Sequence, residues 1–337
     1  MRDFVSRHLL ENGAAFNEHK AAPGHLNYVL EAARNRNLEV QAVGLGHYFY
    51  ADGAVVGGIR KMVTTLVGDV AAQVAESKTV TKQLLERAGV PTPHGRGFKI
   101  YEFASAVAFQ ESLGGPVVLK PAGGRGGEGV RCNVRDSAEF ERAWAYTAGI
   151  TAKGSRVLVE EQVAGIDIRA YVIGDTVIAA ATRLPSFVVG DGATTVADLI
   201  ELKTEKRARN AYLARGAIVM DEEVVTEQGY ALGSVPEHGE VVVLNGVANV
   251  HQGGENVDIT RLISPELADL AVRAARAIPG LRAAGIDLIT PSLDTSDGAV
   301  VLEANVSANI GMHHLPAYGE PVDVAAALVE EMLDHSC

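Results

Sequence analysis

The spacing of hydrophobic positions predicts that helices and strands alternate along the chain. Apolar residues recur at helical intervals in Leu26–Arg34, Ser77–Ala88 and Pro265–Ala277. Short apolar or alternating segments between them, such as Leu38–Val43 and Ala283–Thr290, predict strands. We therefore predict an α/β protein of the α+β type.

Turn residues suggest how these elements are grouped. The strand that begins at Gly165 and the strand Thr176–Arg183 flank a Gly-Asp turn, which predicts a hairpin. The helix Ser77–Ala88 is stopped by a glycine and two prolines, so a domain boundary fits there, after a small α/β unit over residues 1–75. Residues 210–240 are polar and irregular, which predicts a mobile or inserted region.

The stretch Pro116–Val134 has the pattern of a strand, a glycine loop and a second strand. It cannot be a dinucleotide fingerprint, which must open a helix, because Val130–Val134 is β-like. No Gly-Lys-Ser/Thr closes the loop, so it is not a P-loop either. Two interpretations remain: a glycine hairpin whose N–H groups cover phosphates, with Lys120 on the first strand, and a surface turn without a ligand. The glycines are Gly123, Gly124, Gly126, Gly127 and Gly129.

Charge and hydropathy limit the class of partner. The net charge of −12, without a clustered basic stripe, argues against a nucleic acid. No apolar run approaches the length of a membrane span, and the amino terminus lacks the hydrophobic region of a signal peptide, so we expect a cytoplasmic protein with no membrane partner. Cys132 and Cys337 are too few for a disulfide framework, and we expect Cys132 to be a small buried side chain.

Acidic residues on two predicted strands near the end of the chain suggest a metal site. Asp287 lies in Ala283–Thr290, while Glu303 and Asn305 lie two positions apart in Val300–Asn305 and so point to one face. Oxygen ligands of this kind suit Mg²⁺, which fills its shell with phosphates and water. The alternative is a pair of unrelated acids at strand ends.

Two further polar pairs are candidates for a site. Glu160 and Glu161 follow an apolar strand, where carboxylates are costly to bury unless they meet donors, although the strand could simply reach solvent there. His313 and His314 either line a site or lie solvated in a loop.

The order of these motifs resembles that of the ATP-grasp carboxylate-amine ligases. A helix with a lysine precedes K-P-A-G-G-R-G-G-E-G-V, V-E-E-Q-V, two arginine strands, an aspartate and E-A-N, over about residues 77–333. The chain is most similar to the branch containing the ATP-grasp domains of cyanophycin synthetase and the bifunctional glutathione synthetases, through Val188–Ile200 and Ala284–Ile289. The resemblance implies an ATP-grasp fold with an N-terminal α/β domain (1–75), a glycine-hairpin lid subdomain (76–163) and a C-terminal mixed sheet with the metal site (164–337).

The same resemblance implies a role for each matching residue. Lysines and lid glycines would hold the ATP phosphates and base, two glutamates and a valine the adenine, one aspartate the ribose, two arginines the transferring phosphoryl group and acyl phosphate, and three oxygen ligands Mg²⁺ or, as an alternative, Mn²⁺. The residues at the phosphates and base would be Lys78, Lys120, Gly124, Gly127 and Gly129. The adenine contacts would be Glu160, Glu161 and Val163, and the ribose contact would be Asp167. The phosphoryl and acyl-phosphate contacts would be Arg169 and Arg183, and the metal ligands would be Asp287, Glu303 and Asn305.

The implied activity is ATP-dependent: a carboxylate is activated as an acyl phosphate and joined to an amine of an amino acid or short peptide, by a protein expected to be a homodimer. The chain has His251-Gln252-Gly253-Gly254 where that branch usually has S-T-G-G, and no proline after Asn305. We therefore expect Asn249, His251, His313 and the first 75 residues to select the substrates. Alternatives are an ATP-grasp enzyme with a thiol or other nucleophile, and a non-catalytic ATP-binding module.

Overall fold

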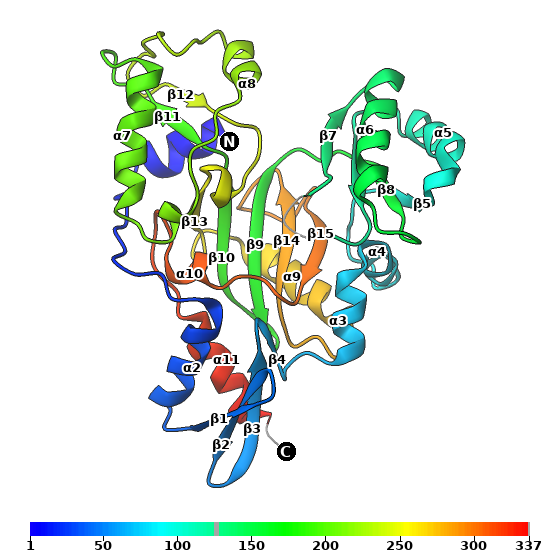
Figure 1. The fold of residues 1–337 in the computed structure, drawn as a ribbon, viewed down its shortest axis with the longest axis vertical. Coiled ribbons are helices and arrows are strands. Elements are labelled where there is room, and N and C mark those ends of the chain that lie inside the picture. Colours follow the sequence, from blue (N-terminus) through cyan, green and yellow to red (C-terminus); the bar gives the residue numbers. More distant parts are fainter. Residues whose placement is uncertain (125–127, 336–337) are drawn as a thin grey trace.

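The computed structural model describes residues 1–124 and 128–335 and is built around a five-stranded antiparallel sheet (Figure 1). Its order is β13-β10-β9-β14-β15. The predicted hairpin is confirmed, because β9 pairs with β10. The strands are β9 (Ile166–Ile173), β10 (Thr176–Leu184), β13 (Glu255–Asp258), β14 (Ala283–Thr290) and β15 (Val300–Asn305).

The register of this sheet brings charged residues of three strands into one row. Asp287 on β14 lies opposite Arg169 on β9 and opposite Glu303 on β15. Neighbouring strands are about 4.8 Å apart, so paired side chains on one face can touch. The row is therefore a consequence of strand pairing and not of loop geometry.

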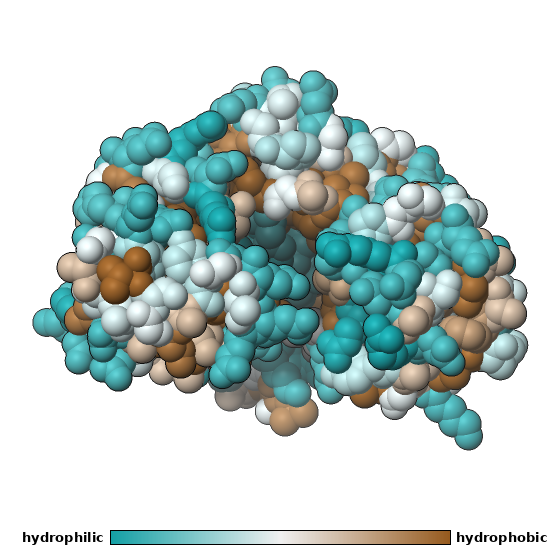
Figure 2. All heavy atoms as spheres, turned by 90° about the horizontal axis from the view of Figure 1, so that it is seen from above, coloured by the Kyte–Doolittle hydropathy of each residue, from teal (hydrophilic) through white to brown (hydrophobic). Residues whose placement is uncertain are grey.

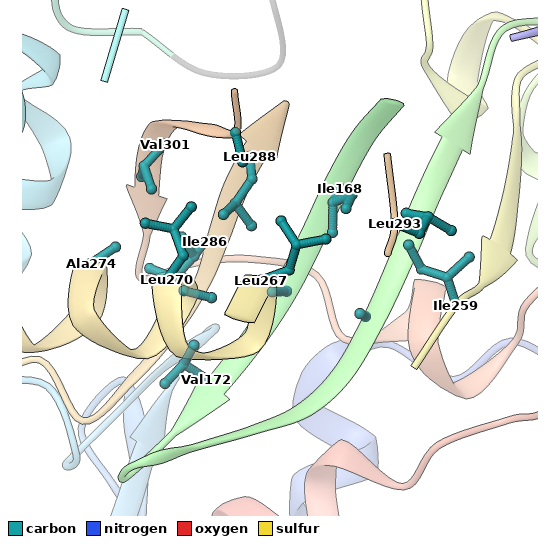
Figure 3. Packing of buried hydrophobic residues seen from close by; sticks show 14 of the residues in the cluster. Ile168, Val172, Ile259, Leu267, Leu270, Ala274, Ile286, Leu288, Leu293 and Val301 are labelled. Carbon is teal, nitrogen blue, oxygen red and sulfur yellow. The ribbon is translucent and has the colours of Figure 1, made fainter. Parts of the chain in front are cut away.

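Helix α9 (Pro265–Arg276) covers one face of the central sheet and forms its core. Ser264 caps the helix by accepting a hydrogen bond from the Leu267 N–H, with Pro265 in the first turn. Leu267 and Leu270 pack toward β9 and β14, as Figure 3 shows with Ile168 and Ile286. Burial of this apolar face fixes the position of β14 and β15, which carry the acids.

A second four-stranded sheet, in the order β5-β8-β6-β7, forms a separate subdomain with two helices packed on it (Figure 1). The glycine loop joins β6 to β7, as predicted, and these strands pair antiparallel. Gly127 and Gly126 lie outside the described residues. The elements are β5 (Gly95–Phe98), α5 (Phe103–Leu113), β6 (Val117–Pro121), β7 (Arg131–Val134), α6 (Ser137–Ile150) and β8 (Val157–Glu161).

The first part of the chain forms a third sheet, in the order β1-β2-β3-β4, which shares its core with the last helix. Helices α2 and α11 pack on each other and on this sheet (Figure 1). α3 and α4 then lead to the subdomain with the glycine loop. The elements are α2 (His25–Asn35), β1 (Glu39–Val43), β2 (Gly46–Ala51), β3 (Ala54–Arg60), β4 (Val63–Thr64), α3 (Asp69–Glu76), α4 (Lys78–Arg87) and α11 (Val324–Asp334).

The remaining segments form a lobe beside β10 and β13. It contains the two-stranded sheet β11-β12, and part of the region 210–240 is helical in it. Within residues 1–124 and 128–335, no helix is long and apolar enough to cross a membrane. The elements are α1 (Arg2–Phe4), a π-helix (Val5–Leu10), β11 (Phe187–Val189), α7 (Val196–Ala208), a 3-10 helix (Leu213–Arg215), α8 (Glu222–Glu227), β12 (Val241–Val243) and a 3-10 helix (Val250–Gln252), with α10 (Gly311–His314) after β15.

Candidate active site

A cavity of about 570 Å³ lies between the glycine-loop subdomain and the central sheet. Seen from above, the surface is hollowed between two masses, the lobe with α7 on one side and the glycine-loop subdomain on the other (Figure 2). The structure brings most of the predicted site residues to the wall of this cavity. They are Lys78, Lys120, Gly124, Glu160, Glu161, Val163, Asp167, Arg183, Asp287, Glu303 and Asn305.

Lys120 and Glu160 form a buried ion pair on the neighbouring strands β6 and β8. Lys82, which the sequence analysis missed, lies 3.7 Å from the same carboxylate and donates hydrogen bonds to Thr92 and Pro93. Burial lowers the pKa of the Lys82 ammonium, which the Glu160 charge opposes. Lys82 lies one helical turn after Lys78 on α4, and this i, i+4 spacing was the signal available in the sequence. Two cations thus share one carboxylate at the end of the cavity formed by β6 and β8.

The chain after β8 leaves backbone groups at the cavity wall. The Glu161 N–H donates to His94 and the Gln162 N–H to Pro116, both at 2.9 to 3.0 Å. Among the described residues, no group accepts a hydrogen bond from the Val163 N–H. The Glu161 carboxylate accepts from the His94 N–H at 2.8 Å and is therefore held against β5. The pattern offers a free donor at Val163 to a ligand.

Lys78, at the start of α4, faces the acids of the central sheet. Its Nζ lies 3.0 Å from Glu303 Oε2 and donates to the Gly124 carbonyl, also at 3.0 Å. The side chain of Glu303 is about one quarter exposed, so the pair is open to solvent and to ligands. One ammonium thus joins the glycine loop to β15.

Asp287 is the centre of the charged row on the central sheet. Arg169 donates two hydrogen bonds to its carboxylate, and Arg183 Nη2 lies 3.3 Å from Asp287 Oδ2 while it also binds Asp167 at 2.7 and 2.8 Å. Burial would raise the pKa of Asp287, but the Arg169 and Arg183 charges hold it well below its usual range. Asp287 is therefore a carboxylate at neutral pH.

The oxygen atoms at this position fit a divalent cation of the magnesium type. Asp287 and Glu303 lie opposite each other on β14 and β15, and two carboxylates on neighbouring strands repel each other unless cations lie between or beside them. Asn305 lies on the same face as Glu303, with its Oδ1 accepting from Ser307. Over the described residues, no three His, Cys, Asp or Glu side chains cluster as a metal site. A metal here would take two carboxylates and an amide, with phosphate and water completing its shell.

Gly124 and Gly129 flank the undescribed part of the glycine loop with backbone angles φ of +157° and +77°. A Cβ on Gly129 would approach Pro121 Cγ to 2.9 Å and clash with Ile150. The Gly129 carbonyl accepts a hydrogen bond of 2.9 Å from the buried Thr147 hydroxyl on α6. Gly129 does not line the cavity, and its role is to let the loop return to β7.

Besides Gly129, four predicted site residues of the described chain lie away from the cavity wall. Arg169 is buried behind Asp287, and Asn249 caps the 3-10 helix that carries the exposed His251. His313 is fully buried against Tyr171, with ring centroids 6.0 Å apart, so the expectation of a solvated loop is wrong for this residue. Burial lowers its pKa to about 3, and Arg169 contributes. Cys132 was expected to be buried, but it is exposed and lines the cavity beside the glycine loop.

Comparisons with known proteins show which family and fold this chain resembles. Residues 77–181 match the ATP-binding domain of the carbamoyl-phosphate synthase L chain, and residues 215–332 match the RimK-like ATP-grasp domain. The chain is 34% identical over 284 residues to a cyanophycin synthetase of Geminocystis herdmanii, covering 81% of this chain and 32% of the relative. It is 32% identical over 264 residues to a glutathione biosynthesis bifunctional protein of Mannheimia succiniciproducens, covering 73% and 34%. The chain thus spans about one third of these curated relatives.

A solved structure of a bifunctional glutathione synthetase from Pasteurella multocida has a similar fold. The TM-score is 0.67 at 23% sequence identity, and the match covers 92% of this chain and 44% of that chain.

Proposed function

We propose that this chain, which belongs to the ATP-grasp family, is an ADP-forming ligase that activates a carboxylate as an acyl phosphate and joins it to an amine. The observation that carries the proposal is the cavity in which Lys78, Lys120 and Arg183 face the carboxylates of Asp287 and Glu303. Such a site can hold a triphosphate with its metal and bring a second anion to it.

The nucleotide would lie between the glycine-loop subdomain and the central sheet. Adenine would accept a hydrogen bond from the free Val163 N–H, while Glu160 positions Lys120 for the phosphates. Asp167 would take the ribose hydroxyls through the lone pairs that its bonds to Arg183 leave available. The glycine loop would close over the triphosphate, with Gly124 and Gly129 as its ends.

Asp287, Glu303 and Asn305 would hold Mg²⁺, with Mn²⁺ as an alternative. When bound, the metal would neutralise the charge that builds up on the transferring phosphoryl group. Arg183, and Arg169 through Asp287, add positive charge at the same place. These side chains keep two anions close enough to react.

The reaction would proceed in two steps. A carboxylate oxygen of the acid attacks the γ-phosphorus, and ADP leaves. The amine then attacks the acyl carbon, loses a proton, and phosphate leaves with the carbon–oxygen electron pair. Because water would destroy the acyl phosphate, closure of the glycine loop over the cavity would protect it. The substrates would be amino acids or short peptides, and a cytoplasmic homodimer is part of the proposal.

A screen for ADP release over pairs of amino acids and short peptides tests the proposal. We expect release with Mg²⁺ or Mn²⁺ and a product whose mass is the sum of the two substrates minus water. A chain that binds a non-hydrolysable ATP analogue but releases no ADP with any pair would instead be a nucleotide-binding module.

A further inference from the structure

Lys82 on α4 is a buried cation that lies close to the cavity without forming part of its wall. Its ammonium donates to the Thr92 hydroxyl at 3.1 Å and to the Pro93 carbonyl, and its Nζ lies 3.7 Å from Glu160 Oε2. A nucleotide in the cavity would not touch this side chain. Any effect of Lys82 on nucleotide binding must therefore pass through Glu160 or through the fold.

Glu160 meets a different ammonium on each of its two oxygens. Lys120 pairs with Oε1, whereas Lys82 lies on the side of Oε2. Val118 is the residue of β6 opposite Glu160, so Lys120, two positions further along, is a diagonal neighbour on the same face of the sheet. On the other side Gly95 of β5 lies opposite Glu160, and a Cβ there would come within 2.5 Å of Glu160 Cβ. Strand pairing thus fixes the carboxylate between two cations from different elements.

The two cations on Glu160 differ in their access to a ligand. Lys82 is enclosed between α4 and the segment before β5, while Lys120 lines the cavity. Burial lowers the pKa of the Lys82 ammonium, and the charge of Lys120 lowers it further, while the Glu160 charge opposes both. The two ammoniums therefore repel each other across the carboxylate. This repulsion weakens the attachment of Lys120, which is the cation that a ligand can reach.

A buried carboxylate that loses its cation is strongly destabilising. If Glu160 were paired with Lys120 alone, a phosphate could take Lys120 only by breaking a buried, neutral pair. With Lys82 on the second oxygen, Glu160 keeps a partner when Lys120 turns toward a phosphate. Two ammoniums and one carboxylate also leave one positive charge, which a phosphate would neutralise.

We propose that Lys82 is a positioning residue for the nucleotide: by holding Glu160, it leaves Lys120 free to bind the phosphates. The inference rests on the proposed function, because it requires a triphosphate in the cavity. Lys82 would contact neither nucleotide nor substrate and would act through the shared carboxylate. A purely structural role, in which Lys82 only anchors α4 to Thr92 and Pro93, makes a different prediction.

Calorimetric titration of the full chain with adenylyl imidodiphosphate, a non-hydrolysable ATP analogue, and Mg²⁺ separates the two roles. In Lys82→Met, Lys120 remains bound to Glu160, and we expect affinity for the analogue to fall at least about tenfold. Addition of Glu160→Gln removes the charge that holds Lys120, so the double variant should return to within about threefold of the wild type. A structural anchor predicts no such recovery, because the contacts with Thr92 and Pro93 are still missing.

Arg87→Met is the matched control, because it removes an exposed cation from the same helix, and it should bind the analogue like the wild type. Lys82→Gln, whose amide can still donate to the Pro93 carbonyl, serves if Lys82→Met does not fold in a urea titration. It should lose affinity as Lys82→Met does and recover it with Glu160→Gln. Wild-type affinity in the Lys82 variant, or a loss that Glu160→Gln does not reverse, overturns the proposal.

The same titrations distinguish this inference from the proposed function. A wild-type chain that does not bind the analogue contradicts the nucleotide site, and both proposals fail with it. A wild-type chain that binds the analogue as tightly as its Lys82 variants overturns only the role of Lys82. Absence of ADP release with every substrate pair contradicts the ligase proposal and leaves the binding result in place.

Discussion

Lys78 Nζ and Glu303 Oε2 lie 3.0 Å apart and join the start of α4 to β15 across the cavity. The same ammonium donates to the Gly124 carbonyl, so a single side chain connects the glycine loop with the acids of the central sheet. A triphosphate with its metal would compete for both partners, since phosphates attract the ammonium and the metal attracts the carboxylate. We infer that this pair opens when nucleotide binds.

Glu303 and Asp287 should respond differently to loss of their charge. Glu303→Gln changes a partly exposed side chain, and we expect ADP release to fall at least about a hundredfold with little change in stability. Asp287→Asn leaves the buried Arg169 without its carboxylate, which costs on the order of 3–5 kcal/mol of folding free energy in addition to activity. Activity assays and urea unfolding of both variants check this. Equal stability losses would contradict the arrangement described for Asp287.

Lys120 should matter for nucleotide affinity more than for folding. Lys120→Ala removes a charge-assisted contact to the phosphates, while Lys82 remains 3.7 Å from Glu160 and limits the cost of the unpaired carboxylate. We expect affinity for a non-hydrolysable ATP analogue to fall at least tenfold in a calorimetric titration. Lys153→Ala, at an exposed lysine of the same subdomain, is the control. An unchanged dissociation constant for Lys120→Ala would instead favour the interpretation of the glycine loop as a surface turn without a ligand.

Two glycines of the loop, Gly123 and Gly129, give a test of its conformation. Gly129→Ala forces a left-handed residue, at about 1–2 kcal/mol, and drives a methyl group into Pro121 and Ile150. Gly123→Ala adds a methyl with no neighbour closer than 3.9 Å and serves as the control. We expect weaker ATP-analogue binding and faster proteolysis between β6 and β7 for Gly129→Ala alone. Identical behaviour of the two variants would show that the loop end tolerates side chains.

Much of the architecture could be predicted from the sequence because the signals are local. Apolar periodicity located β14 and β15 at their observed bounds, and the ordered motifs predicted the ATP-grasp fold, which is confirmed. The glycine pattern placed a hairpin between β6 and β7. These features depend on neighbouring residues and on backbone chemistry, which a sequence displays directly.

Contacts between residues far apart in the sequence could not be predicted from these local signals. His313 and His251 are both polar residues in loops by sequence, yet one is fully buried under Tyr171 and the other is exposed. Their difference arises from how α10 packs on the central sheet, many residues away along the chain. The second cation on Glu160, Lys82, depended likewise on how α4 docks against β8.

The buried histidines should make folding stability depend on pH. Burial lowers the pKa of His313 to about 3 and that of His25 to about 4, whereas an unfolded histidine titrates near 6.5. Between these pH values the unfolded chain binds protons that the folded chain does not. The free energy of unfolding therefore falls, and the protein becomes less stable, as pH decreases below about 6.5. Above pH of about 6.5 these histidines are neutral in both the folded and the unfolded chain, and their contribution to stability is fully present.

His313→Leu tests this assignment, because it removes one titrating group from a site where neither ring nitrogen has a hydrogen-bond partner among the described residues. The wild type should lose about 1.4 kcal/mol per pH unit from this residue within the window, a slope absent in the variant. Urea unfolding at intervals from pH 7.5 to 4.5 measures the difference, and His238→Leu, at an exposed histidine, is the control. If His313→Leu keeps the pH slope of the wild type, His313 is protonated in the folded chain and must meet an acceptor that the buried position does not show. An effect of His313 on a substrate is a separate matter, and it would be seen as a raised KM for that substrate in a variant whose stability is unchanged.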